Sequence, residues 1–186
     1  GGGAASRARG GNPAGCATGC ARLGDLFWEG RGVDKDRSKA ASLYQQGCTP
    51  KPLFNNDKYR DAYACSRLAD LQASGEEVPR NQEEAGAHYD TACSLGYRSA
   101  CIPAAEIVFA NKSATPKQWK AAAFQLGKAC NDGIKAACER QERECRTGHA
   151  TACLSAAKSY DVAKRKAHPW AMPRDPAREM EFLTLG

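Results

Sequence analysis

The apolar positions of this chain follow a helical spacing that glycines interrupt. From Cys20, the small or apolar residues Leu23, Gly24 and Phe27 recur at intervals of three and four, as on one face of an α-helix. The sequence Gly-Arg-Gly-Val at residues 30–33 then ends the run. A second run begins after Asp36, which is a typical N-cap residue, and carries Ala40, Leu43, Tyr44 and Cys48. The pattern predicts two antiparallel helices.

The same order of elements returns further along the chain. A second block starts at Cys65, is interrupted at Gly75, and resumes at Asn81 with Glu84 three residues later, which predicts a capping box. In the third block, residues 115–118 (Thr-Pro-Lys-Gln) offer an N-cap, a first-turn proline and a glutamine at the third helical position. No stretch alternates like a strand between turn signals, so the sequence predicts an all-α chain.

The ten cysteines repeat with a period of roughly three dozen residues. They stand at positions 16, 20, 48, 65, 93, 101, 130, 138, 145 and 153. Three segments, 93–101, 130–138 and 145–153, share the pattern C-x2-G-x3-A-C. Three copies of a nine-residue pattern with four common positions indicate one corner, repeated between successive pairs of helices.

These residues resemble a known family. Residues 23–33 (LGDLFWEGRGV), followed by Asp36, Ala40 and Tyr44, look like the Sel1-like repeat, a relative of the tetratricopeptide repeat. The cysteine pattern is similar to that of the cysteine-rich Sel1-like proteins often labelled Hcp-type β-lactamase-like proteins. The resemblance implies a right-handed α/α solenoid of about four to five helix pairs stapled by disulfides, spanning residues 13–186 after a flexible segment at residues 1–12.

The chain departs from that pattern in several places. Residues 49–57 form an inserted loop, and the third repeat has residues 111–114 (Asn-Lys-Ser-Ala) in place of the Gly-x-Gly turn. The short interval between Cys138 and Cys145 predicts a truncated repeat. The last repeat is cut at Gly186, which is consistent with a further repeat beyond it.

The resemblance also implies how the cysteines pair. In that family a disulfide joins the end of one repeat's second helix to the start of the next repeat. Cys138 and Cys145 lie seven residues apart on one helix, or about 10 Å at the helical rise, which is too far for a disulfide. The expected pairs are therefore 48–65, 93–101, 130–138 and 145–153. Cys16 and Cys20 are left over; either they pair with each other outside regular helix, or Cys16 pairs elsewhere.

The amino-acid composition indicates the compartment in which the protein is expected to work. Lys and Arg number 27 against 21 Asp and Glu, for a net charge of +6, and 42% of residues are hydrophobic. No apolar run approaches the roughly 20 residues of a membrane-spanning helix. Ten cysteines are typical of an oxidising compartment, so we expect a periplasmic or extracellular protein, with any export signal or anchor upstream of residue 1.

The sequence contains few motifs that would indicate a metal site or a catalytic site. There is no C-x-x-C pair and only three histidines, which argues against a metal site, and no cofactor is expected. Ser155 and Lys158 match the S-x-x-K motif of penicillin-recognising enzymes, but the residues between them occupy helix-packing positions of the repeat. We therefore expect no catalytic residues.

Two further features bear on partners. The basic run that includes residues 164–166 is typical of a solvated face, and Trp170 alone is thin support for nucleic-acid binding. The aromatic residues are expected in the repeat core or as anchors of the insertion, and some of them could line a concave groove; they are Trp28, Phe54, Tyr59, Tyr63 and Trp119.

The function favoured by the sequence is a monomeric scaffold that binds a protein or peptide through the concave face of the solenoid, without nucleic acid. Two alternatives follow from the resemblance alone. One is a penicillin-binding or weakly β-lactamase-like protein, and the other is an assembly factor of the mitochondrial intermembrane space.

Overall fold

The computed structural model describes residues 17–49, 60–148 and 152–154, and these ranges contain helices and no strand. The elements, in order, are α1 (Ala17–Glu29), α2 (Arg37–Cys48), α3 (Ala62–Ser74), α4 (Gln82–Ser94), the 3-10 helix η3 (Arg98–Ala100), α5 (Cys101–Ala110), α6 (Pro116–Asn131) and α7 (Lys135–Arg146). Residues 152–154 are also helical.

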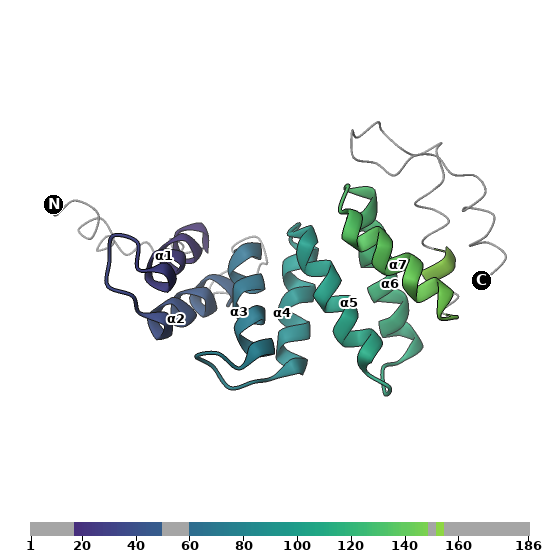
Figure 1. The fold of residues 1–186 in the computed structure, drawn as a ribbon, viewed down its shortest axis with the longest axis horizontal. Coiled ribbons are helices and arrows are strands. Elements are labelled where there is room, and N and C mark those ends of the chain that lie inside the picture. The colour runs from purple at the N-terminus through teal and green to yellow at the C-terminus, as the bar shows by residue number, and fades with distance from the viewer. Residues whose placement is uncertain (1–16, 50–59, 149–151, 155–186) are drawn as a thin grey trace. The chain divides into compact units, whose positions relative to one another are not determined.

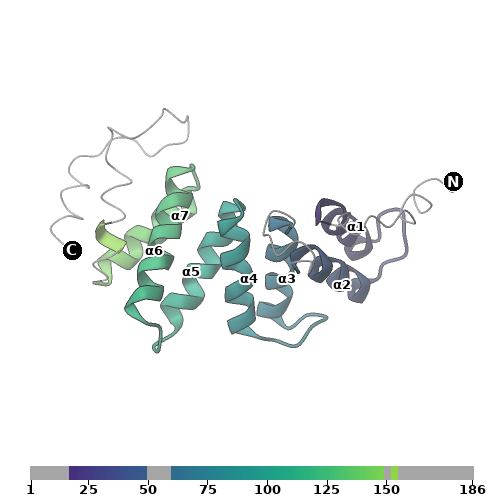
Figure 2. The ribbon, with the colours of Figure 1, turned by 180° about the vertical axis from the view of Figure 1, so that it is seen from behind.

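The chain divides into two compact units between Asn81 and Gln82. In the first unit, α1 packs against α2 and α2 against α3. In the second, each helix from α4 to α7 packs against the next, and η3 joins the corner between α4 and α5 (Figures 1 and 2). This sequential packing of helices confirms the predicted class, an all-α repeat fold.

Two helix starts, those of α2 and α6, follow the predicted capping chemistry. The side chain of Asp36 accepts a hydrogen bond from the backbone N–H of Lys39 at 2.9 Å and so caps α2. Thr115 and Gln118 form a complete capping box at the start of α6. Asp61 caps α3 by accepting from the N–H groups of Tyr63 and Ala64, a cap that the sequence reading did not single out.

The repeated nine-residue pattern is a helix–turn–helix corner. Its three glycines, Gly96, Gly133 and Gly148, have φ values of 105°, 93° and 94°, a left-handed conformation that ends a helix and favours glycine. The N–H of each glycine donates to the carbonyl of the cysteine three residues before it, at 2.9–3.1 Å. The alanines of the pattern, Ala100, Ala137 and Ala152, are at most 2% exposed. The four common positions therefore supply the turn, the close packing and the two thiols.

The core is built largely from small side chains around a few large ones. Tyr44 of α2 is fully buried and lies against Gly24 of α1, where an added Cβ would approach the ring to 2.7 Å. Ala40, Ala69, Ala85 and Ala105 are at most 1% exposed, as expected for helices that approach closely.

α7 is a single helix that carries both Cys138 and Cys145, with no second helix between them. The flexible segment predicted for residues 1–12 and the cut last repeat lie outside the described residues, as does the inserted loop except Thr49. The domain boundaries therefore stay predictions.

Candidate binding surface

Four cysteine pairs lie at bonding distance. Sulfur–sulfur distances are 2.13 Å for Cys48–Cys65 and 2.03 Å for Cys93–Cys101. They are 2.05 Å for Cys130–Cys138 and 2.07 Å for Cys145–Cys153, and the Cα atoms of all four pairs are 4.5–4.9 Å apart. These are the pairs that the sequence predicts.

Cys20 is also in a disulfide and fully buried. The predicted role of Cys16 lies outside the described residues, so the pairing of Cys16 stays a prediction.

The first unit holds a group of aromatic and arginine side chains, which we call the Trp28 cluster: Asp25, Trp28, Arg37, Tyr44, Tyr63 and Arg67. The guanidinium carbons of Arg37 and Arg67 lie 4.8 and 5.5 Å from the centre of the half-buried Trp28 ring. Arg67 also lies 5.4 Å from the Tyr44 ring and forms an ion pair with Asp70 at 3.3 Å. Side chains from α1, α2 and α3 thus meet at one indole.

Within the same cluster, the Asp25 carboxylate joins two tyrosines. The hydroxyls of Tyr44 and Tyr63 donate to the same oxygen of Asp25, at 2.8 and 3.2 Å. Burial, helped by the charge of Asp25, raises the pKa of Tyr44 to about 12 against the opposing effect of Arg67. Burial alone would lower the pKa of Arg67, but its hydrogen bond to Tyr44 and the nearby acidic groups raise it. Both groups therefore keep their protons at neutral pH, and neither is suited to proton transfer.

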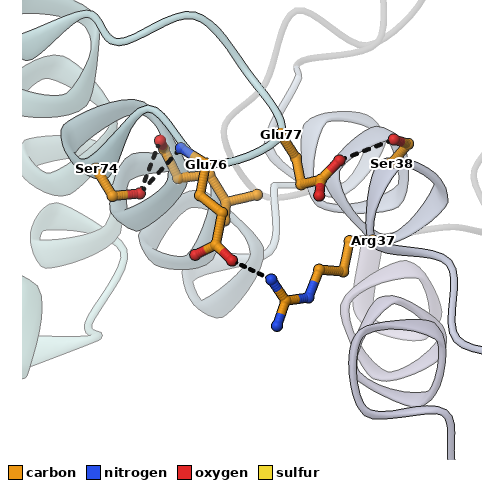
Figure 3. Close-up of polar contacts among 6 residues, drawn as sticks. Arg37, Ser38, Ser74, Glu76 and Glu77 are labelled. Carbon is orange, nitrogen blue, oxygen red and sulfur yellow. Dashed lines mark hydrogen bonds and ion pairs between the residues drawn. The ribbon is translucent and has the colours of Figure 1, made fainter.

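The start of α2 is tied to the loop that follows α3 (Figure 3). Arg37 forms an ion pair with Glu76, and the hydroxyl of Ser38 donates to Glu77 at 2.9 Å. Glu77 has a φ of 64°, a left-handed conformation that is uncommon for a residue with a side chain. These contacts hold Arg37 in place over Trp28.

Beside this tie lies a shallow hollow lined by residues 34–38 and Glu77. Its charged side chains are of both signs, two basic and three acidic. This mixture defines neither an anion nor a cation site.

The second unit has an arrangement of the same kind. Arg140 of α7 lies 5.4 Å from the centre of the Phe109 ring of α5, and that ring stacks on Trp119 of α6 at 4.7 Å. Arg140 also forms ion pairs with Glu106, at 3.4 Å, and with the buried Glu144. In both units, therefore, an arginine on the first helix of one helix pair contacts an aromatic ring on the first helix of the preceding pair.

The arginine–aromatic contact that recurs in both units is visible in the spacing of the residues, although the sequence analysis did not identify it. Arg67 and Arg140 each stand two residues after a cysteine, Cys65 and Cys138. Trp28 and Phe109 each stand eight residues after the preceding first-helix cysteine, Cys20 and Cys101. Comparing the blocks position by position from the cysteines would have paired each arginine with its ring.

Several predicted residues lie outside the described ranges. They are Phe54, Tyr59, the S-x-x-K residues Ser155 and Lys158, the basic run at 164–166 and Trp170. Among the residues described, no group of three or more His, Cys, Asp or Glu side chains could hold a metal ion. No helix in the described part of the chain has the length and apolar character needed to cross a membrane.

The corner geometry and the helix pairs match a known repeat. Residues 17–49 and 62–97 fit the family model described as the Sel1 repeat. These two stretches match the Sel1 repeat, the family that the sequence resembles. Sel1 repeats typically form scaffolds for protein–protein interaction and are generally not enzymes.

Two solved structures are similar to this chain. A Sel1 repeat protein from Oxalobacter formigenes is 18% identical with a TM-score of 0.49, over 93% of this chain and 73% of that one. The second is c5321, a protective antigen present in uropathogenic Escherichia coli strains that displays an SLR fold; it is 17% identical with a TM-score of 0.38. That match covers 90% of this chain but only 45% of the other, so this chain spans less than half of its length. The curated proteins contain no match.

Proposed function

We propose that this protein is a disulfide-stapled scaffold that binds a protein or peptide partner in an oxidising compartment, periplasmic or extracellular, without a catalytic step of its own. The Trp28 cluster carries the proposal. Tryptophan, tyrosine and arginine are the residues that dominate binding energy at protein interfaces. Here they converge on a half-buried indole of α1, and solenoid repeats often bind extended partners through their concave surfaces.

Rigidity supports this role. Arg67 is fixed by Asp70 and Arg37 by Glu76, so both guanidinium groups are held over Trp28 before a partner arrives. The bridge between Cys48 and Cys65 joins the helices that supply the two arginines. A surface ordered in advance loses less conformational entropy on binding, which favours affinity.

The cysteines support the proposed compartment. Disulfides persist in oxidising compartments and are rare in the cytosol. Four pairs at bonding distance, all joining consecutive helices, fit a protein that matures where thiols are oxidised. The proposed protein is monomeric and needs no cofactor.

Photo-crosslinking tests the binding surface. A benzophenone amino acid replaces Trp28 in the full-length protein, which is irradiated in its native compartment. We expect a discrete adduct that is lost when Arg67→Ala is added. The same replacement at Tyr97, a half-buried aromatic residue of the second unit that lies outside α6, is the control. An adduct of equal yield from both positions, or none from position 28, would contradict the proposal.

A further inference from the structure

Helix α6 exposes an aromatic side chain. Phe124 is 63% exposed and, with Leu154, is one of two exposed large hydrophobic residues in the described part of the chain. The opposite side of α6 is buried, with Ala122, Ala123 and Leu126 at most 8% exposed. Phe124 therefore contributes little to the core.

Three lysines share this side of α6 with the ring. Lys117, Ala121, Phe124 and Lys128 follow one another at helical spacing along one stripe of α6, and Lys120 lies one turn before Phe124. The ammonium group of Lys128 is 5.8 Å from the centre of the Phe124 ring. α6 itself contains no acidic residue. We call residues 117, 120, 121, 124 and 128 the α6 face.

The neighbouring helices do not neutralise these lysines. Arg140 takes Glu106 of α5 and Glu144 of α7, while Lys135 takes Glu139 of α7. Asp132, which follows α6, pairs with Arg98 at 2.5 Å. No ion pair joins Lys117, Lys120 or Lys128 to a carboxylate within the described ranges. The α6 face thus keeps its positive charge around an exposed ring.

We propose that the α6 face docks an acidic segment of a partner protein, with carboxylates against the lysines and an apolar side chain against Phe124. Interfaces reach their specificity through such charge complementarity, and an aromatic ring at the centre supplies apolar contact. This surface lies in the second unit and is distinct from the Trp28 cluster, so either one can fail without the other.

Other occupants fit less well. A helix that lies on a membrane needs a broad apolar face, whereas the α6 face offers one large apolar side chain. Single-stranded nucleic acid is bound by several stacking aromatics, and this face has one. Two of the chain's own other segments have no net negative charge: residues 1–16 carry two arginines and no acid, and residues 155–186 carry six basic and four acidic residues.

Titration with a defined probe tests the proposal. The probe is a short fluorescein-labelled peptide of Glu and Asp around a central Leu, and binding to the full chain is followed by fluorescence anisotropy at low salt. We expect Phe124→Ser and Lys120→Glu each to weaken binding about tenfold. Both side chains are exposed, so circular dichroism should show unchanged folding.

The matched control is Lys39→Glu in the first unit. Lys39 is also an exposed lysine over a phenylalanine ring, 4.1 Å from the centre of Phe27, but it lies outside the α6 face. Lys39→Glu should change the affinity for the peptide by no more than about twofold. If only the net charge of the protein mattered, Lys39→Glu would weaken binding as much as Lys120→Glu does. A second peptide with Gln and Asn in place of the acids should bind at least about tenfold more weakly.

Three results would overturn the proposal. The first is an equal loss of affinity in Lys39→Glu and Lys120→Glu. The second is tighter binding of phosphatidylserine vesicles or of a single-stranded DNA oligonucleotide, lost in the same α6 variants. The third is self-association in sedimentation experiments that Phe124→Ser abolishes, because it would make a second copy of the chain the occupant.

Discussion

Tyr44 shows how single residues connect the helices of the first unit. Its ring is fully buried against Gly24, its hydroxyl donates to Asp25, and Arg67 lies over its face. Because these contacts come from two other helices, α1 and α3, the side chain has little freedom to move. Substitutions of the residues that pack against this ring should therefore lower the stability of the protein.

Gly24 gives a direct test of that packing. Gly24→Ala would place a methyl group 2.7 Å from Tyr44 Cε1, so the ring must shift. Gly19→Ala, in the same helix, meets no atom within 4 Å and measures the gain from helix propensity alone. We expect Gly24→Ala to be less stable than Gly19→Ala by about 2 kcal/mol in urea unfolding. Equal stabilities would mean that the two helices separate easily.

Tyr44 should also make stability depend on alkaline pH. Its folded-state pKa of about 12 lies above the ordinary value of 10.0, so the folded protein holds the phenol proton more tightly than the unfolded chain. This contribution is complete below pH 10 and is lost as the pH rises from about 10 to 12. Tyr44→Phe should remove that part of the decline. Unfolding by urea at a series of pH values measures it, and an identical decline in both proteins would contradict the assignment.

At the scale of the helices, side-chain caps mark the starts of α2, α3 and α6. α6 starts with a capping box, and its first turn contains Pro116, whose missing N–H costs nothing there. The same helix carries the α6 face. The residue at which α6 begins therefore determines where the lysines of its first turns lie, so the capping box helps to position the proposed docking surface.

Thr115→Ala should lower stability by about 1 kcal/mol, because it removes the acceptor for the N–H of Gln118. Thr91→Ala is the control: the Thr91 hydroxyl donates to the carbonyl of Ala87 within α4, at 2.8 Å, and caps no helix. That change should alter stability by less than about 0.5 kcal/mol. Urea unfolding measures the stability of both variants. Equal losses of stability would argue against a capping role for Thr115.

At the scale of the whole molecule, disulfides join consecutive helices in both units. Cys48–Cys65 joins α2 to α3, while Cys93–Cys101 and Cys130–Cys138 join successive helices of the second unit. In a repeat protein each repeat contacts only its neighbours, so fraying can begin at any junction. Bridges at the corners oppose that fraying.

We expect non-reducing peptide mapping of the mature protein to find these pairs, together with Cys145–Cys153. Reduction should lower the melting temperature while leaving most of the helical circular dichroism near room temperature, because the bridged helices are held by their own packing as well. Close to ten free thiols per chain in material purified from its own compartment would contradict the prediction and the proposed location.

The fold was largely predictable from the sequence. The spacing around Cys20 and Cys65 predicted the helices, and Asp36 and Thr115 predicted two of their starts. The shared glycine and alanine positions marked the corners. These signals were readable because helical periodicity, capping and turn conformation depend on residues a few positions apart.

The candidate surfaces were less predictable. Trp28 was expected in the core or in a groove, but the arginines that lie over it and the exposure of Phe124 were not foreseen. Apolar residues at helical spacing indicate that a helix has a buried side, but a single aromatic on that helix can face either way.

By itself, the sequence determined the helices, the corners between them and which cysteines are close enough to bridge. The tertiary structure decided that Arg67 reaches Trp28, 39 positions away, that Tyr44 occupies the space beside Gly24, and that Phe124 faces outward. The physical reason is range. Turn and helix signals act between near neighbours, whereas contacts between distant residues depend on how closely the packed helices approach, which their small core residues allow.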